Sequence, residues 1–137
     1  MGAPRHAFLA GLHDDEMATV VAFMQGRRYH AGEHAIRRGE VDRTVFAVTA
    51  GSFDVVVPGR RTEPLTTGDL FGEIAFFDSL PRSADVVARE PSEALLLTPA
   101  GFDRLRLNEP RLAMLVLIDL GRALSERLRR LEAGGRG

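Results

Sequence analysis

The chain has 137 residues, of which 45% are apolar and 27% are charged. These are ordinary values for one globular domain, so we expect a single domain spanning residues 1–137. The formal net charge of −1 argues against direct nucleic-acid binding, because nucleic-acid-binding proteins present a basic surface. The sequence has no Cys, which excludes disulfide bonds, thiolate catalysis and zinc–thiolate sites.

No segment predicts a targeting signal or a membrane span. Residues 1–10 lack the apolar core of a signal peptide. The longest apolar stretch, Leu112–Ile118, is too short to cross a bilayer. We therefore expect a cytoplasmic protein that has no membrane partner.

The N-terminal part of the chain predicts a helix between His13 and Met24. Met17, Val20 and Val21 recur at helical spacing within it. The acidic residues 14–16 stand at its start, where a helix favours negative charge. We interpret them as a helix start and not as a metal cluster.

From Tyr29 to about Thr98 the pattern changes to that of strands. Short apolar runs alternate with turn signals roughly every ten residues, at Val45–Val48, Phe53–Val57, Ala84–Ala88 and Ala94–Leu97. This spacing predicts a β-sandwich or a small barrel over about residues 29–98.

The helical period returns after Pro99. It predicts a short helix over Pro99–Leu107 and a longer one over about Pro110–Leu131, with proline in the first turn. Leucines spaced three and four apart form an apolar seam on the longer helix, at Leu117, Leu120, Leu124, Leu128 and Leu131. This seam packs either on the barrel of its own chain or on the same helix of a second copy, and different parts of one helix could do each.

The segment Gly68–Ala84 carries the chemistry. Gly72 lets a backbone approach closely, and the five residues after it suit a single helical turn whose free N–H groups would face an anion. Pro81, Arg82 and Ser83 then supply a rigid turn, a guanidinium and a hydroxyl. These features together predict a phosphate site.

Glu73 makes the predicted ligand of this phosphate site more specific. A carboxylate repels a phosphate, but it accepts a hydrogen bond from a hydroxyl. A phosphate with a hydroxyl beside it describes a nucleotide. A cyclic phosphate carries one negative charge and leaves the 2′-hydroxyl free, so one Arg and one Glu, here Arg82 and Glu73, match it.

The segments Phe71–Ala75 and Pro81–Ala84 resemble the phosphate-binding cassette of cyclic-nucleotide-binding domains, which runs Phe-Gly-Glu-(Leu/Ile)-Ala, a short spacer and Pro-Arg-(Ser/Thr/Ala)-Ala. Upstream, Ala31–Glu33, Gly39–Glu40 and Gly51 are similar to the early strands of the same family. The resemblance extends over roughly residues 9–131. It implies a mainly β fold with flanking helices (α+β), an eight-stranded jelly-roll-like β-barrel (double-stranded β-helix) with one helix before it and two after.

The resemblance also implies roles for individual residues. Arg82 would pair with the phosphate and Glu73 would accept from the ribose 2′-hydroxyl, and the remaining sugar–phosphate contacts would come from Gly72, Ile74, Ala75 and Ser83. The last helix would act as a lid that folds over the base and often dimerises. Its candidate lid residues are Arg122, Ser125, Arg127 and Leu128, and an Arg there could stack on or hydrogen-bond a purine.

The identity of the ligand stays open between two bases. Ser83 is compatible with cAMP, and its hydroxyl could also serve cGMP, so we expect cAMP first and cGMP second. The short loop Pro58–Pro64 could remove base or sugar contacts that other members of the family make.

These residues and two histidines allow two other interpretations. Glu73 and Arg82 could form a buried ion pair without a ligand, as in a degenerate domain that serves as an interaction module, although such a pair adds little net stability. His30 and His34 suggest a metal, because positions i and i+4 of one strand share a face. No third ligand accompanies them, so we expect no metal.

Three function classes follow. The first, a ligand-binding signalling module, is preferred. The second is a fragment of a Crp-like transcription regulator, whose helix-turn-helix we do not expect in a chain that ends at Gly137. The third is a regulatory piece of a channel or an enzyme. We do not expect catalysis by the chain itself, because no Ser stands in a nucleophile setting with a His base.

Overall fold

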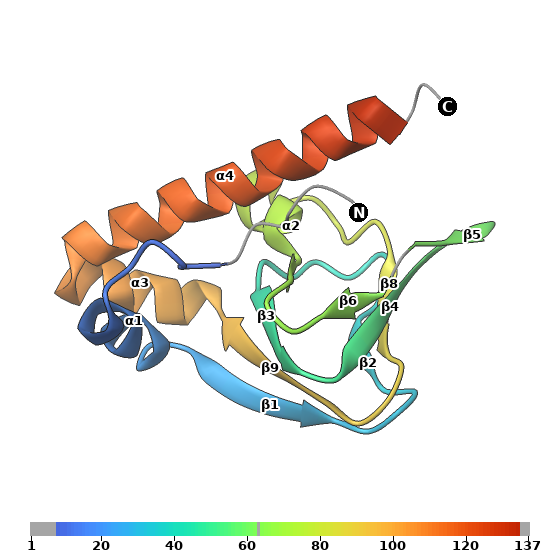
Figure 1. Cartoon of the computed structure of the whole chain (residues 1–137), viewed down its shortest axis with the longest axis horizontal. Coiled ribbons are helices and arrows are strands. Elements are labelled where there is room, and N and C mark those ends of the chain that lie inside the picture. Colours follow the sequence, from blue (N-terminus) through green and yellow to red (C-terminus); the bar gives the residue numbers. More distant parts are fainter. Residues whose placement is uncertain (1–7, 63, 135–137) are drawn as a thin grey trace.

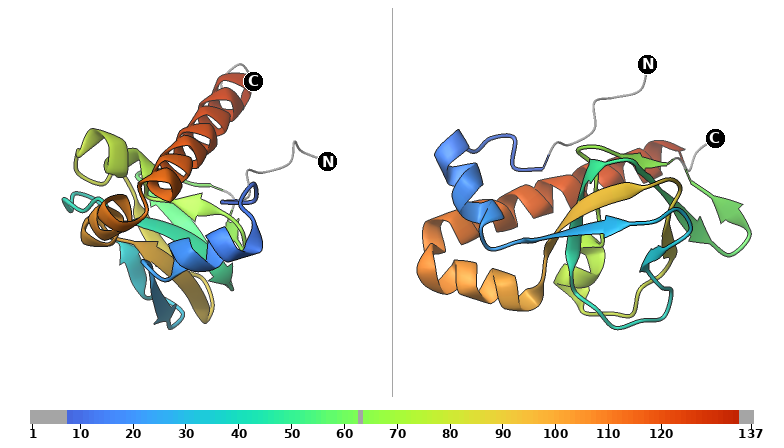
Figure 2. Two further views of the ribbon diagram at one scale, coloured as in Figure 1. Left: turned by 90° about the vertical axis from the view of Figure 1, so that its left-hand side faces the viewer. Right: turned by 90° about the horizontal axis from the view of Figure 1, so that it is seen from below.

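The computed structural model describes residues 8–62 and 64–134. Two antiparallel sheets face each other in a jelly-roll-like arrangement, and the helices gather at one side of them (Figures 1 and 2). The first sheet has the order β1 (Gln25–Tyr29), β9 (Ser92–Leu97), β3 (Val45–Ala50), β7 (Leu70–Phe71). The second has the order β2 (His34–Ile36), β8 (Asp85–Ala88), β4 (Ser52–Val57), β5 (Arg60–Arg61), and β6 (Leu65–Thr66) also pairs with β4. The predicted fold class is confirmed.

The helices in chain order are α1 (Asp14–Val21), α2 (Glu73–Asp78), α3 (Pro99–Asn108) and α4 (Pro110–Gly134). The Thr98 hydroxyl caps the first turn of α3 by accepting from the Gly101 N–H at 3.0 Å. α4 is the longest element, and it passes across the top of the molecule above α2 (Figure 1). It extends three residues beyond the end expected from its leucine pattern.

The start of the barrel differs from the prediction. α1 ends at Val21, and two backbone bonds, Phe23 N–H to Val20 O and Met24 N–H to Val21 O, turn the chain into β1. β1 begins at Gln25, four residues before the expected start of the strands, and four of its five residues are exposed. An edge strand of this kind has no apolar alternation, and periodicity therefore does not detect it.

His30 and His34 do not share one strand. β1 ends at Tyr29 and β2 begins at His34, and a turn containing Gly32 in the left-handed region (φ 88°) separates them. His34 lies near Asp85 instead, with 3.7 Å between its Nε2 and the carboxylate. The expectation that these two histidines lie on one strand face is wrong.

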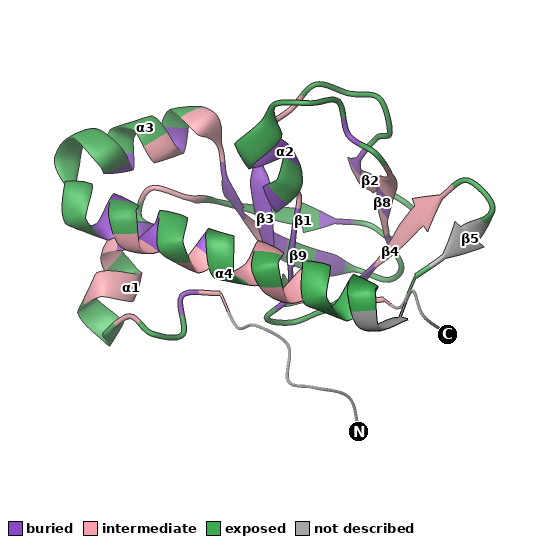
Figure 3. Cartoon of the chain, turned by 90° about the horizontal axis from the view of Figure 1, so that it is seen from above, coloured by how far each residue is buried: buried purple, intermediate pink, exposed green. Residues whose placement is uncertain are grey.

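The apolar core has two parts. One part fills the barrel, where the rings of Phe46 and Phe71 stack with centroids 4.6 Å apart and Tyr29 meets Phe53 edge-on. The other part joins the barrel to the helices, and its fully buried members include Leu97, Leu105 and Leu120. This second core fixes the first half of α4 on the barrel (Figure 3).

The leucine seam of α4 divides between two faces. Leu120 is 0% exposed and packs in the core, whereas Leu117, Leu128 and Leu131 are 38%, 53% and 57% exposed. Met114, at 62% exposed, continues the outward row. The helix therefore packs on its own barrel through one face and leaves a second apolar row on its surface.

The N-terminal segment also holds the first half of α4. The backbone N–H of Leu9 donates to Asp119 Oδ2 at 2.7 Å, and Arg111 forms an ion pair with Glu16 of α1. The side chain of Leu9 is buried in the same core as Leu120. The second half of α4 lies instead over the cassette.

Candidate functional site

A cavity of about 510 Å³ lies between the cassette, the barrel and the second half of α4. This volume is within the range of small-molecule sites. The cassette contributes residues 69–75 to one wall, and Arg82, Ser83 and Ala84 return along it. Strands β2, β4 and β8 contribute Ile36, Val55 and Val86.

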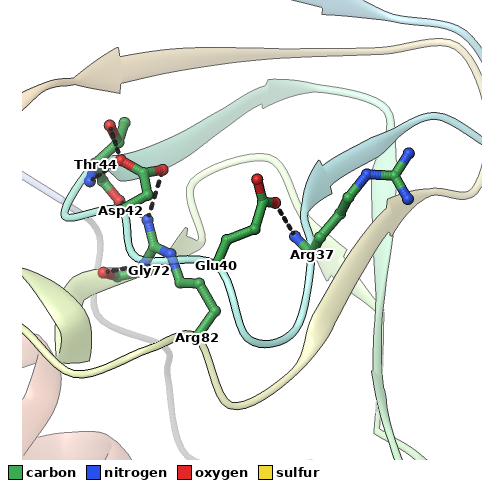
Figure 4. Close-up of polar contacts among 6 residues, drawn as sticks. All are labelled: Arg37, Glu40, Asp42, Thr44, Gly72 and Arg82. Atoms are coloured by element: carbon green, nitrogen blue, oxygen red, sulfur yellow. Dashed lines mark hydrogen bonds and ion pairs between the residues drawn. The ribbon is translucent and has the colours of Figure 1, made fainter.

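Arg82 is held in the wall of this cavity by oxygens of other segments. Its side chain is 4% exposed, and it donates to Gly72 O at 2.9 Å, to Thr44 O at 2.6 Å and to Asp42 Oδ2 at 3.2 Å. Figure 4 shows the guanidinium between the cassette and the segment that leads into β3. The guanidinium also lies 6.0 Å from the centroid of Phe46. Its orientation is therefore fixed before any ligand binds.

Gly72 makes this arrangement possible. It adopts φ 85°, in the left-handed region, and a Cβ there would lie 2.7 Å from Thr44 O and 2.9 Å from Arg82 Nη1. Any other residue would push the cassette away from the guanidinium. α2 starts directly afterwards, at Glu73, so the N–H groups of its first turn have no acceptor within the helix.

Glu73 is the most buried charged residue of the site. It is 1% exposed, and its Oε1 forms an ion pair with Arg127 of α4. Arg127 also donates to Leu70 O at 3.2 Å. Since a lone buried carboxylate is strongly unfavourable, this pair offsets the charge of Glu73 and links α4 to the cassette.

Both carboxylate oxygens of Glu73 and the Nε of Arg82 are buried and have no hydrogen-bond partner in the described part of the chain. Glu73 Oε1 forms the ion pair with Arg127, which leaves two atoms without any partner. These atoms are Glu73 Oε2, an acceptor, and Arg82 Nε, a donor. Unpaired buried polar atoms are uncommon in folded proteins and call for an explanation. A ligand that carries a hydroxyl donor beside an anionic oxygen would satisfy both. Glu73 and Arg82 do not pair with each other; each has its own partner, Arg127 or Asp42.

The pKa of Asp42 reflects its contact with Arg82. Burial raises this pKa, but hydrogen bonds from the Thr44 hydroxyl and backbone N–H, and from Arg82, outweigh burial, and the pKa lies below its ordinary value of 3.8. The Thr44 donors approach Asp42 Oδ1 at 2.9 and 3.1 Å. Asp42 is therefore ionised at neutral pH and supports the charge of Arg82.

The expected site residues occupy different positions in the structure. The cassette residues line the cavity together, namely Gly72, Glu73, Ile74, Ala75, Arg82 and Ser83. Of the four candidate lid residues, Arg127 lines the cavity, whereas Arg122, Ser125 and Leu128 lie outside its lining. The face of α4 that meets the cavity carries Ala123, Arg127, Arg130 and Leu131.

Asp42 and Arg130 were not found from the sequence. Asp42 lies forty residues before Arg82 and carries no local motif. The four residues of α4 that meet the cavity are spaced four, three and one apart, which is one helical face. That spacing is a usable signal once it is known which face of α4 meets the barrel.

Two general findings concern the described residues only. Within them no three His, Cys, Asp or Glu side chains gather as metal ligands do. None of the helices described is both long and apolar enough to cross a membrane.

Comparison with known proteins identifies the family. The family model of the cyclic nucleotide-binding domain matches residues 26–109, a span that contains the whole cassette and the barrel around it. The chain therefore belongs to the cyclic nucleotide-binding domain family. It is a family of ligand-binding regulatory domains, and its barrel and cassette account for the cavity described above.

Individual relatives place the domain in several larger proteins. Glutaminase 1 of Bradyrhizobium diazoefficiens is 33% identical over 88% of this chain and 20% of its own length. The cAMP-dependent protein kinase regulatory subunit of Eremothecium gossypii is 32% identical over 74% of this chain and 24% of its own length. The chain thus spans about a fifth to a quarter of these relatives.

Solved structures show the same fold. The catabolite activator protein of Thermus thermophilus is 28% identical, with a TM-score of 0.82, over 93% of this chain and 61% of that one. A protein kinase A regulatory domain, solved with Sp-2Cl-cAMPS, is 24% identical with a TM-score of 0.75.

We expect Asp42→Asn to lower the stability of the protein at pH 7, because Arg82 would lose the anionic partner that it has among the described residues. The folded-state pKa of Asp42 is lowered, so its contribution is present above the unfolded-state pKa and is lost as the pH falls through the folded-state value. Urea unfolding of the wild type and the variant at pH 7 and at about pH 3 measures this. The difference in unfolding free energy between the wild type and Asp42→Asn should be smaller at acidic pH. Asp103→Asn, on exposed α3, is the control, and a difference that is independent of pH would contradict this role of Asp42.

Proposed function

We propose that this chain is a sensor module that binds a cyclic nucleoside monophosphate in the cavity beside α2. One observation supports this most strongly. The buried acceptor Glu73 Oε2 and the buried donor Arg82 Nε lie in the wall of the same cavity and have no partners in the described structure. A cyclic nucleotide offers a 2′-hydroxyl to the first and a phosphate oxygen to the second.

In this proposal, different cassette residues bind different parts of the ligand. Arg82 takes the phosphate as a charge-assisted donor, and Glu73 accepts from the ribose. The N–H groups of Gly72, Ile74 and Ala75, with Ser83, complete the sugar–phosphate contacts. Arg127 offsets the charge of Glu73, and this reduces its repulsion of the phosphate.

The base is the finer part of the proposal. Ser83 favours cAMP from the sequence, and the relatives include regulatory subunits of cAMP-dependent protein kinases. A cGMP-dependent protein kinase of Toxoplasma gondii is also 33% identical, over 63% of this chain. We take cAMP as the first ligand to test and cGMP as the second.

The second half of α4 is the element that responds. Arg127 ties it to Glu73, the residue that receives the ribose. Ligand binding changes the surroundings of that carboxylate and so the balance between two positions of the helix. The shift is limited to the difference in ligand affinity between those positions. The first half of α4 stays fixed through Leu9 and Glu16.

The output of the sensor is a further proposal. The relatives are several times longer than this chain, which favours a module that controls other segments or a partner. Likeness to the Thermus catabolite activator protein favours the regulator of transcription as a second candidate. A cytoplasmic location remains a prediction from the sequence.

We expect Arg82→Ala to weaken cyclic-nucleotide binding by about 2–5 kcal/mol, the range for truncating one partner of a buried charged contact. Calorimetric titration with cAMP and cGMP separately measures it. Arg104→Ala, on the exposed face of α3, should leave both affinities unchanged. Equal affinity of the wild type and the Arg82 variant would sink the proposal, and absence of binding by the wild type would favour a degenerate interaction module.

The exposed row on α4 supports a homodimer. Met114, Leu117, Gly121, Leu124, Leu128 and Leu131 are spaced alternately three and four residues apart, which is the spacing of a two-helix seam. A Cβ at Gly121 would meet nothing within 4 Å, so the packing of a single chain does not require glycine there. A glycine would, however, let a second helix approach closely.

We expect Leu128→Asp to convert this dimer to a monomer, because it places a charge within the apolar seam. Sedimentation equilibrium measures the change. Leu107→Asp is the control, since Leu107 is 71% exposed and lies on α3 outside the seam. A monomeric wild type at high concentration, or dissociation in both variants alike, would contradict the seam.

A further inference from the structure

The three residues that lead into β3 contact two different parts of the cassette. Asp42 and Thr44 hold Arg82, through a carboxylate oxygen at 3.2 Å and a backbone carbonyl at 2.6 Å (Figure 4). Arg43, which stands between them in the sequence, contacts α2 instead. Its Nη2 donates to Phe76 O at 2.9 Å, and its guanidinium lies 5.6 Å from the centroid of the Phe76 ring. One short segment therefore holds both the arginine of the cassette and its helix.

Phe76 O belongs to the last turn of α2, which is only six residues long. The last four carbonyls of a helix have no donor within it. In α2, Ala75 O accepts from the Ser79 N–H at 3.0 Å, and Phe76 O accepts from Arg43. A cation at this end also interacts favourably with the dipole of the helix. Arg43 therefore caps α2 from outside the cassette.

These contacts close a ring around Glu73, the first residue of α2. Arg82 Nη1 donates to Gly72 O at 2.9 Å, directly before the helix begins. Arg43 binds Phe76 O, which lies three residues after Glu73, about 4.5 Å along the helix axis. Both ends of this short helix are thus anchored to the entrance of β3, one through Arg82 and the other through Arg43.

We propose that Arg43 is a positioning residue, which sets the place of the Glu73 carboxylate relative to the guanidinium of Arg82. This inference rests on the proposed function, in which the ribose hydroxyl binds the first of these groups and the phosphate binds the second. Both contacts form together only when the two side chains have the correct separation. Arg43 is not part of the lining of the cavity, so it acts on the ligand through α2.

Two other contacts hold α2, and both involve neighbouring helices. The ring of Phe76 is 5% exposed and packs edge-on against Phe102 of α3, and Arg127 of α4 pairs with Glu73. Apolar burial is non-directional, and α4 is the element that moves in the proposed function. The hydrogen bond from Arg43 has a defined geometry and joins α2 to the barrel, which stays fixed.

The test is calorimetric titration of the full chain with cAMP, cGMP and the 2′-deoxy form of each, because the affinity ratio of parent to 2′-deoxy ligand measures the contact of the hydroxyl. Arg43→Met removes the donors but keeps an apolar chain against the Phe76 ring, and Arg43→Lys keeps a cation with a donor. Arg38→Ala is the matched control, since Arg38 is an exposed arginine of the preceding loop and binds Asp85 through its backbone N–H. Urea unfolding of each variant measures its global stability.

We expect Arg43→Met to weaken binding of the parent nucleotide about three- to tenfold, the range for one net hydrogen bond. The 2′-deoxy form should be weakened by less than about twofold, so the affinity ratio should fall. Arg43→Lys should recover part of this ratio, and Arg38→Ala should leave it unchanged. A role in stability alone would weaken both ligands equally, because it lowers the fraction of binding-competent protein for each alike.

Equal weakening of the parent and 2′-deoxy ligands in Arg43→Met, or unchanged affinity for both, would overturn the inference while leaving the proposed function standing. A ratio that Arg43→Lys does not recover at all would overturn it too, because that variant retains a donor. A wild type that binds neither nucleotide would instead overturn the proposed function, and the role of Arg43 with it. A wild type that binds without preference for the hydroxyl would overturn the role of Glu73 and, with it, that of Arg43.

Discussion

Two ionised side chains lie buried on the wall of one cavity without pairing with each other, and the rest of the structure is arranged around them. Glu73 and Arg82 are 1% and 6% exposed. Removing such charges from water costs several kcal/mol each unless partners compensate. Arg127 compensates the first and Asp42 the second. Because the compensation comes from outside the cassette, both charges remain available to a ligand.

The two partners connect the cassette to different elements. Asp42 and Thr44 stand at the entrance to β3, so the orientation of Arg82 depends on the first sheet. Arg127 stands on α4, so the environment of Glu73 depends on the position of that helix. A ligand that contacts both charges is therefore linked to the barrel through Arg82 and to α4 through Glu73. In the proposed function, the barrel is therefore the fixed side of the domain and the second half of α4 is the responsive side.

Much of the fold and the cassette could be predicted from the sequence, because they are encoded by local patterns. β3, β4, β8 and β9 are short apolar runs bounded by turn signals, and the cassette is a contiguous motif. β1 could not be predicted from the alternation of apolar and polar residues, because most of its residues are exposed at a sheet edge. The division of the leucine seam depends on how α4 rotates against the barrel. Leu120 and Leu128 belong to the same row of leucines in the sequence. Only Leu120 is buried, because the packing of α4 on the barrel covers it.

The cassette residues of the site could be predicted from the sequence, but the residues that hold their charged side chains in place could not. Asp42 acts on Arg82 across forty residues of sequence, and Arg130 reaches the cavity only because of the helix rotation that also buries Leu120. The sequence suggested Arg122, Ser125, Arg127 and Leu128 as a lid, but these four do not form one helical face. The pairing of Glu73 with Arg127 instead of with Arg82 is likewise a property of the assembled fold. It leaves Glu73 Oε2 and Arg82 Nε open.

The proposed function depends most on the hydrogen bond that Glu73 would accept from the ribose 2′-hydroxyl. It is tested most directly by titrating the wild type and Glu73→Gln with cAMP and with 2′-deoxy-cAMP in a double cycle. We predict that loss of the hydroxyl weakens binding to the wild type by about 1.5–3 kcal/mol, the range for a hydrogen bond to a charged group. The same loss should have a much smaller effect on Glu73→Gln. An equal penalty in both proteins would contradict the account, because the hydroxyl would then be bound elsewhere.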